Sequence, residues 1–249
     1  MLVENETNQV LSVIIPCFNE ENSVLDLLKR VLSQSVVGQV VVIDDGSDDN
    51  SVLEISKISD PRLLLLKNEK NMGKGKSIWR GIQHADKEFL IIQDADLEYD
   101  PADYQALLQP LMNGKADVVF GSRFISNGPR RALYFWHRVG NNLLTLFSNM
   151  ATNIDLTDME TCYKMMKTKY AKLLEIEEPR FGIEPEMTAK LAAMKIRIFE
   201  VPISYNGRTY DEGKKITWKD GFSALRCILK YNTRKQKKKQ IKKIDSPSD

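Results

Sequence analysis

The chain has 249 residues, of which 42% are hydrophobic and 28% are charged, and its formal net charge is +2. A chain of this size and composition can bury a substantial core and fits one large or two small domains, and we interpret it as one. Its longest apolar runs, residues 40–43 and 63–66 among them, are far shorter than the roughly 18 residues that a membrane-spanning helix requires. No membrane span is predicted.

The two ends of the chain differ in charge. The first six residues are acidic and lack the basic start and apolar stretch of a signal peptide, so a cytosolic location is expected. Nine of the 36 basic residues follow Gly221, with no acidic residue before Asp245. The chain is therefore an acidic body with a basic tail. Its three cysteines are far apart in sequence and indicate neither a disulfide framework nor a Cys-x-x-Cys metal site.

Short apolar runs alternate with amphipathic segments in the first part of the chain. Residues 11–15, stopped by Pro16, predict the first strand, and the apolar positions of residues 24–32 recur at helical spacing. A second buried strand at 40–43 ends in the acidic turn Asp44-Asp45-Gly46-Ser47, and a third strand is predicted at 63–66. This alternation predicts βαβ units and a parallel sheet.

Residues 71–77, Asn-Met-Gly-Lys-Gly-Lys-Ser, open the next predicted helix. The backbone at Gly73 and the side chain of Lys74 offer N–H groups and positive charge to a phosphate. The segment matches neither a Walker loop nor the dinucleotide fingerprint, and a mobile loop is the alternative interpretation.

The apolar run 89–92 is closed by the carboxylates of Asp94, Asp96 and Glu98. Four apolar residues in a row predict a strand buried on both faces, and alternate residues beyond it can point at one object. Converging carboxylates suit a hard divalent ion such as Mg²⁺ or Mn²⁺. A solvated acidic turn is the alternative. Because ligands bind beyond the carboxyl ends of parallel strands, we expect this cluster and Asp45 on one rim, with Arg123 after a strand at 117–120.

Several motifs in order resemble the inverting glycosyltransferases of family 2, and most closely the dolichol- and polyprenyl-phosphate mannose synthases. They are Val-Ile-Ile-Pro-Cys-Phe-Asn-Glu-Glu at 13–21, Val-Ile-Asp-Asp-Gly-Ser at 42–47, Asn-Met-Gly-Lys-Gly at 71–75, Asp-Ala-Asp-Leu-Glu at 94–98 and Gly-Ser-Arg-Phe at 121–124. The resemblance implies a GT-A fold, an α/β architecture with a mostly parallel, Rossmann-like sheet and helices on both faces. It also implies a GDP- or UDP-sugar donor and Mg²⁺ or Mn²⁺.

The resemblance also implies roles for single residues. The base and ribose would be held by Pro16, Phe18, Glu20 and Asp45, and the metal and diphosphate by Asp94, Asp96 and Glu98. Residues 208–215 resemble the family's Arg-x-x-Gly-x-Ser-Lys loop with longer spacing and Lys214 in place of Ser, so Arg208 and Lys215 are carried over as donor ligands.

The acceptor side rests on residues 121–164. Arg123 and Arg138 match the positions at which lipid-phosphate relatives place acceptor-binding arginines. The segment 157–164 resembles the family's acceptor motif, in which Asp158 or Glu160 is either a base or a structural ion-pair partner. The aromatic residues 134–136 beside arginines predict a membrane-interface contact, and the alternative is that they cap the core.

The C-terminal region predicts an amphipathic helix. Its apolar stripe is Trp218, Phe222, Leu225 and Leu229, and it either lies in a membrane interface or packs on its own domain. The predicted organisation is an N-terminal extension (1–10), a GT-A domain (11–215), this helix (216–231) and a basic disordered tail (232–249). An anionic membrane surface is the expected partner of the basic segment, and no nucleic acid is expected.

The predicted function is an inverting, metal-dependent transfer of a sugar from a nucleotide-sugar to a polyprenyl or dolichyl phosphate, at the cytosolic membrane face. Two alternatives remain. One is a glycosyltransferase that acts on a sugar or protein hydroxyl, and the other is a catalytically silent nucleotide-sugar binding module.

Overall fold

The computed structural model of the chain describes residues 9–125, 131–132, 134–180, 182–208 and 218–245. Across these residues seven strands form one sheet in the order β3-β2-β1-β4-β6-β5-β7. The strands are β1 (Leu11–Cys17), β2 (Val37–Asp44), β3 (Leu63–Lys67), β4 (Phe89–Ile92), β5 (Val118–Ser122), β6 (Lys164–Lys167) and β7 (Ile198–Pro202). Strand β6 is antiparallel to β4 and β5, and the other strand pairs are parallel. The predicted α/β class and mostly parallel sheet are confirmed.

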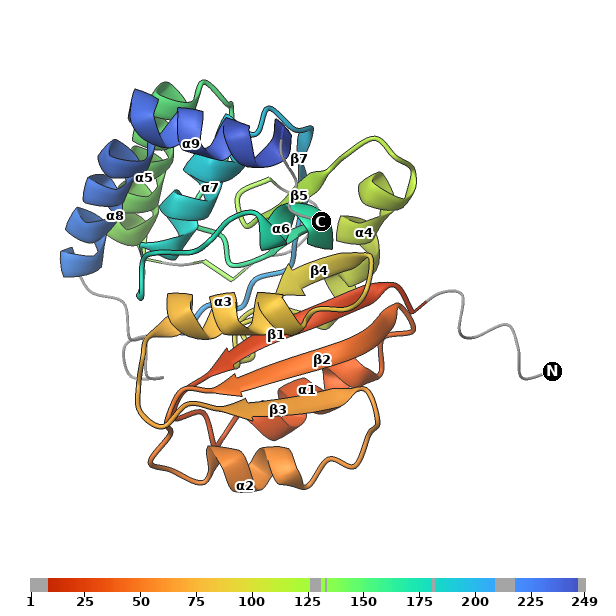
Figure 1. The fold of residues 1–249 in the computed structure, drawn as a ribbon. Coiled ribbons are helices and arrows are strands. Elements are labelled where there is room, and N and C mark those ends of the chain that lie inside the picture. Colours follow the sequence, from red (N-terminus) through yellow and green to blue (C-terminus); the bar gives the residue numbers. More distant parts are fainter. Residues whose placement is uncertain (1–8, 126–130, 133, 181, 209–217, 246–249) are drawn as a thin grey trace.

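Helices cover both faces of the sheet (Figure 1). Their bounds are α1 (Val24–Leu32), α2 (Ser51–Ser56), α3 (Lys74–His84), the 3₁₀ turn η2 (Pro101–Asp103), α4 (Tyr104–Met112), α5 (Phe135–Thr152), α6 (Thr168–Lys172), α7 (Ile183–Ala193), α8 (Trp218–Tyr231) and α9 (Arg234–Asp245). Helices α5, α7, α8 and α9 gather beside one another, away from β3 and α2 (Figure 1). Within the described ranges, no helix is long and apolar enough to cross a membrane.

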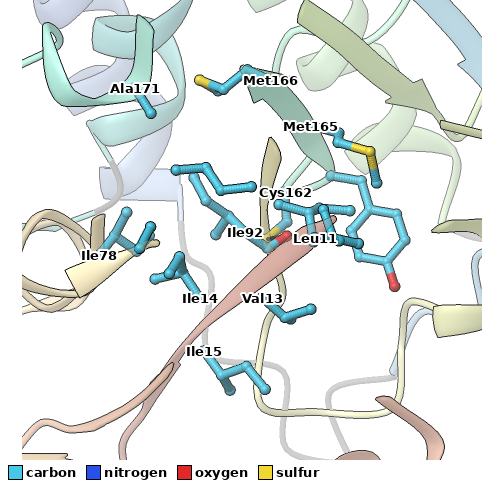
Figure 2. Packing of buried hydrophobic residues seen from close by; sticks show 14 of the residues in the cluster. Leu11, Val13, Ile14, Ile15, Ile78, Ile92, Cys162, Met165, Met166 and Ala171 are labelled. Atoms are coloured by element: carbon cyan, nitrogen blue, oxygen red, sulfur yellow. Dashed lines mark hydrogen bonds between the residues drawn. The ribbon is translucent and has the colours of Figure 1, made fainter. Parts of the chain in front are cut away.

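The core lies between the sheet and its helices. The apolar residues of β1, β2 and β4 that the sequence pattern predicts as buried are buried. Figure 2 shows Ile14 of β1 beside Ile78 of α3, with Ile92 of β4 nearby. Helix α3 approaches β1 closely at Gly81, where an added Cβ would lie 2.5 Å from Cγ2 of Ile14. Gly81 therefore keeps α3 against the strands whose ends carry the predicted site.

Strand β6 was not predicted. Its sequence, Lys164-Met165-Met166-Lys167, has no β-branched or aromatic residue and no alternation, so the local pattern indicates no strand. The residues pair on both sides, with β4 and β5, and Met165 and Met166 are fully buried. The neighbouring strands supply the hydrogen bonds and burial that the local sequence does not encode.

The C-terminal segment corrects one expectation. We expected a disordered tail over residues 232–249, but residues 234–245 form α9. The helix is anchored to the body: the Lys237 ammonium donates to the carbonyl of Ala151, and the Lys243 ammonium lies 2.5 Å from a carboxylate oxygen of Glu175. Acidic residues elsewhere in the body therefore offset part of the lysine repulsion that predicts disorder.

Helix α8 packs with the face opposite its predicted stripe. Its buried residues are Ala224, Cys227, Ile228 and Tyr231. Phe222 and Leu229 from the predicted stripe are 69% and 68% exposed. Packing on the domain, one of the two alternatives for that stripe, is therefore wrong for Phe222 and Leu229.

Candidate functional site

Three carboxylates follow β4 and meet cations from distant segments. The Lys74 ammonium lies 2.9 Å from Oδ1 of Asp94. The Arg208 guanidinium lies 2.5 Å from Oδ2 of Asp96 and 3.1 Å from Oε1 of Glu98. The predicted acidic cluster is therefore a mixed-charge site at the carboxyl edge of the sheet rather than a solvated turn.

Arg208 connects the two halves of the predicted donor site. Besides Asp96 and Glu98, its guanidinium lies 3.5 Å from Oε2 of Glu20, in the turn that follows β1. Glu98 fixes the chain around Arg208, because its carboxylate accepts hydrogen bonds from the Arg208 backbone N–H (3.0 Å) and the Tyr205 hydroxyl (2.7 Å). The structure thus brings Glu20, Asp96, Glu98 and Arg208 together, whereas Lys215 lies outside the described residues.

The two aspartates differ in proton affinity. Burial, together with the neighbouring carboxylates of Asp94 and Glu98, raises the pKa of Asp96 to about 7. Burial also acts to raise the pKa of Asp94, but Lys74 outweighs it and holds that pKa below its usual value. Negative charge at Asp96 is therefore incompletely compensated by the protein, and an added cation would stabilise it.

The donor chemistry of this cluster fits a divalent metal only in part. The carboxylate oxygens of Asp94 and Asp96 are the hard ligands that Mg²⁺ and Mn²⁺ prefer. Both oxygens of Glu98 already accept hydrogen bonds from residues 205–208. Among the described residues, no group of three or more acidic, histidine or cysteine side chains is arranged to hold a metal ion. Asp94 and Asp96 are the residues that fit a metal best.

Asp45 anchors the loop before α3. Its carboxylate accepts hydrogen bonds from the backbone N–H groups of Met72 (2.9 Å) and Gly73 (2.8 Å) and from the Asn68 side chain (2.7 Å). The Gly73 backbone has φ 92°, which glycine adopts without strain. Asp45 therefore shapes the loop that carries Lys74, and its contact with a base or ribose stays a prediction, as do those of Pro16, Phe18 and Glu20.

Residues 73–75 are predicted to bind a phosphate, but only the side chain of Lys74 is placed to do so. The Gly73 N–H donates to Asp45, and the Gly75 N–H donates to the Pro179 carbonyl at 2.8 Å. Both groups are engaged inside the protein. The Lys74 ammonium remains as the group with which this loop would contact a phosphate.

On the predicted acceptor side, Arg123 and Asp158 form a buried, bidentate ion pair. Arg123 Nε lies 2.6 Å from Oδ2 and Nη2 lies 2.7 Å from Oδ1 of Asp158, whose side chain is fully buried. Of the two roles left open for Asp158, the geometry favours the structural ion pair over the base. The pKa of Glu160 is raised to about 8 by burial and then by Glu184.

Arg138 lies near Arg123 across one aromatic ring. The guanidinium carbons of Arg138 and Arg123 are 4.9 Å and 5.5 Å from the centroid of the Phe124 ring. The structure therefore brings together the two arginines predicted to bind the acceptor phosphate. Because Arg123 is committed to Asp158, Arg138 is the better placed of the two to bind a ligand.

The comparison with protein families agrees with this geometry. A model described as glycosyl transferase family 2 matches residues 12–174, which is more than half of the chain. The chain belongs to glycosyltransferase family 2. The predicted family membership is confirmed.

Relatives within the family differ in how much is known of them. An uncharacterised protein of Methanocaldococcus jannaschii is 31% identical over 228 residues, which cover 88% of this chain and 97% of that protein. A dolichol-phosphate mannosyltransferase of Pyrococcus furiosus is 25% identical over 225 residues, covering 88% of this chain and 63% of that enzyme. The chain thus spans less than two thirds of the length of the Pyrococcus enzyme.

A solved structure supports the fold. The glucosyl-3-phosphoglycerate synthase of Mycobacterium tuberculosis, crystallised with Mn²⁺, UDP and phosphoglyceric acid, matches with a TM-score of 0.68 at 15% identity. The match covers 91% of this chain and 79% of that one. At this identity the likeness establishes the GT-A fold alone, and the predicted fold class is confirmed.

The sequence pattern did not predict two residues of the candidate site. Glu184, at the start of α7, lies 3.0 Å from the Lys74 ammonium, and Tyr205 holds Glu98. The signal for Glu184 was present in the Phe-Gly-Ile-Glu-Pro-Glu motif at 181–186. Acidic residues are common in the first turn of a helix because they interact favourably with the helix dipole. The motif alone therefore does not indicate that Glu184 pairs with Lys74.

Proposed function

We propose that this family 2 enzyme transfers a sugar from a nucleotide-sugar to the phosphate of a polyprenyl or dolichyl phosphate, with inversion and with Mg²⁺ or Mn²⁺. The observation that carries the proposal is the arrangement of Asp94, Asp96, Lys74 and Arg208 at one rim, with Arg138 and Arg123 on the acceptor side. The Pyrococcus relative, named as a dolichol-phosphate mannosyltransferase, supports this choice of acceptor.

The donor side accounts for the leaving group. A divalent ion held by Asp94 and Asp96 would neutralise the nucleoside diphosphate as it departs. Lys74 and Arg208 add fixed positive charge beside these carboxylates, and an arginine can grip two phosphate oxygens at once. Both cations are held by carboxylates of the protein, so they are positioned before a substrate arrives.

The acceptor side favours a phosphate over a hydroxyl. A sugar hydroxyl requires a positioned general base, whereas a phosphate monoester with a second pKa of about 6 is already largely dianionic at neutral pH. Asp158 is fully buried in its ion pair with Arg123 and is poorly placed to act as a base. Arg138 supplies the cation that a phosphate needs. Because the solved synthase is crystallised with phosphoglyceric acid, a non-lipid acceptor is the second candidate.

A transferase assay with matched acceptors tests the proposal. GDP- and UDP-sugars, with Mn²⁺ or excess chelator, are supplied with polyprenyl phosphate, with the dephosphorylated polyprenol or with a sugar acceptor. We expect product with the phosphate, and none in chelator. Arg138→Ala should raise KM for the lipid phosphate, because it removes a charged hydrogen-bond donor to that phosphate. The affinity for the nucleotide-sugar should stay within about twofold, because Arg138 is assigned no contact with the donor. Wild-type transfer to the sugar acceptor, equal in Arg138→Ala, would establish the second candidate.

We also propose that the enzyme works as a peripheral protein on an anionic membrane. The outer residues of α5 form an exposed apolar stripe. Helix α8 packs beside α5 (Figure 1), and its residues Phe222 and Leu229 are exposed. The α5 stripe comprises Phe135, Trp136, Leu143, Leu146, Phe147 and Met150. Trp136 is 78% exposed and therefore does not cap the core, which was the alternative for the aromatic segment. Exposed aromatic and aliphatic side chains of this kind suit the interface between lipid headgroups and acyl chains.

Liposome co-sedimentation distinguishes the apolar from the basic contribution. Arg226 and Lys230 pair with Glu178, so α9 supplies the exposed cations Lys235, Lys238 and Lys242. Removing residues 232–249 would also remove the packing of α9 on the body. The test therefore substitutes these three lysines by glutamine. At about 1 kcal/mol for each cation, binding to anionic vesicles should fall by roughly 100-fold at low salt. Trp136→Ser should weaken binding at high salt as well. Vesicle binding that stays unchanged in both sets of variants and at high salt would contradict the proposal.

A further inference from the structure

Helix α7 begins with two buried carboxylates, Glu184 and Glu186, separated by Pro185. Acidic side chains are rarely buried unless they are paired, because the loss of hydration is expensive. Glu184 pairs with Lys74, whereas Glu186 pairs with Lys190 of the same helix and also accepts two backbone N–H groups from the segment beside the loop that carries Lys74. The start of α7 therefore contacts the donor side of the site from beneath.

Glu184 holds the side chain of Lys74. Its Oε1 lies 3.0 Å from the Lys74 ammonium, which on its other side lies 2.9 Å from Oδ1 of Asp94. Lys74 therefore bridges two carboxylates from different elements, the turn after β4 and the start of α7.

Glu186 holds the backbone against which the loop rests. Its carboxylate accepts hydrogen bonds from the N–H groups of Glu177 and Glu178, both at 2.8 Å. The next residue, Pro179, accepts the Gly75 N–H, and a Cβ added to Gly75 would lie 1.9 Å from the Glu178 carbonyl oxygen. The segment 177–179 is thus a fixed floor for the loop.

We infer that Glu184 is a positioning residue, which holds the Lys74 ammonium between two carboxylates so that Lys74 meets the donor diphosphate and Asp94 keeps its capacity for a cation. With Asp94 as its sole anion, Lys74 would form a closed pair and compete with any metal for that carboxylate. Glu184 draws the ammonium toward α7 and weakens that competition. Glu186 fixes the segment 177–179, on which the loop that carries Lys74 rests. The inference rests on the proposed function, because it assigns Lys74 to the diphosphate.

A double-mutant cycle tests whether Glu184 acts through Lys74. The variants are Glu184→Gln, Lys74→Met and the double variant, and the readouts are the calorimetric affinity for GDP or UDP with Mn²⁺ and the kcat and KM for the nucleotide-sugar. Loss of a residue that orients a ligand typically reduces affinity or activity by about 10–100-fold. We expect that loss in Glu184→Gln, and no further loss when it is added to Lys74→Met.

Two further variants keep the test decisive. Asp26→Asn, which makes the same carboxylate-to-amide change in the exposed Lys29–Asp26 pair of α1, is the matched control and should stay within about twofold of wild type, as surface pairs contribute little. Glu184→Asp keeps the charge with a shorter reach and should show a smaller loss of the same kind, also where Glu184→Gln does not fold. Wild-type affinity in Glu184→Asp and Glu184→Gln, or independent effects of Glu184 and Lys74, would overturn the inference alone. A wild type that binds no nucleoside diphosphate would overturn the proposed function as well.

Discussion

Asp96→Asn is expected to lower turnover by at least about 100-fold, because loss of a metal-held charge in the transition state amounts to several kcal/mol. Asp94→Asn should be nearly as severe. Asp96 lies in the turn after β4, where burial and its neighbours already disfavour its negative charge. A neutral asparagine relieves that repulsion, so the melting temperature should not fall. Initial rates and thermal unfolding of the same preparation measure both effects.

The control for this prediction lies at the other end of the same strand. Asp86 is an exposed aspartate between α3 and β4, and Asp86→Asn should leave the rate and the melting temperature unchanged. Full transferase activity in the Asp94→Asn, Asp96→Asn double variant would refute the metal assignment. Undiminished wild-type activity in excess chelator would refute it equally.

Arg123→Ala should destabilise the protein by about 3–5 kcal/mol, because it leaves the buried carboxylate of Asp158 without its partner. For a chain of this length, such a change lowers the melting temperature by roughly 6–20 °C. Removing both charges in Arg123→Met, Asp158→Leu should restore part of the loss, because no charge then remains unpaired. Urea unfolding of Arg123→Met, of Asp158→Leu and of the double variant measures the coupling.

An exposed ion pair gives the matched comparison. Lys29 and Asp26 lie 3.7 Å apart with side chains 60% and 64% exposed, and Asp26→Ala should change the unfolding free energy by less than about 1 kcal/mol. An Arg123→Ala variant as stable as Asp26→Ala would show that the Asp158 carboxylate does not depend on the pair. Arg123 would then be free to serve the acceptor phosphate as first predicted.

Much of the fold was determined by local sequence alone. The runs at residues 40–43 and 89–92 are apolar without interruption, the run at 11–15 is apolar except for Ser12, and a strand covered on both faces buries every residue of such runs. Because the carboxyl ends of parallel strands lie at one edge of the sheet, the sequence pattern also predicts that the carboxylates after β2 and β4 share one rim. The five motifs between residues 13 and 124, taken together and in order, indicated family 2.

The tertiary structure decided how the charged side chains pair. Lys74 with Glu184, Arg208 with Asp96 and Arg123 with Asp158 are separated by 110, 112 and 35 residues. Periodicity reports which face of an element is buried, but it carries no information on which distant charge lies opposite. The antiparallel β6 and the buried face of α8 have the same origin, since neighbours remote in sequence supplied their hydrogen bonds and packing. The sequence by itself therefore determined the parallel strands, the rim and the family, and packing between remote segments determined which charges are committed to structure.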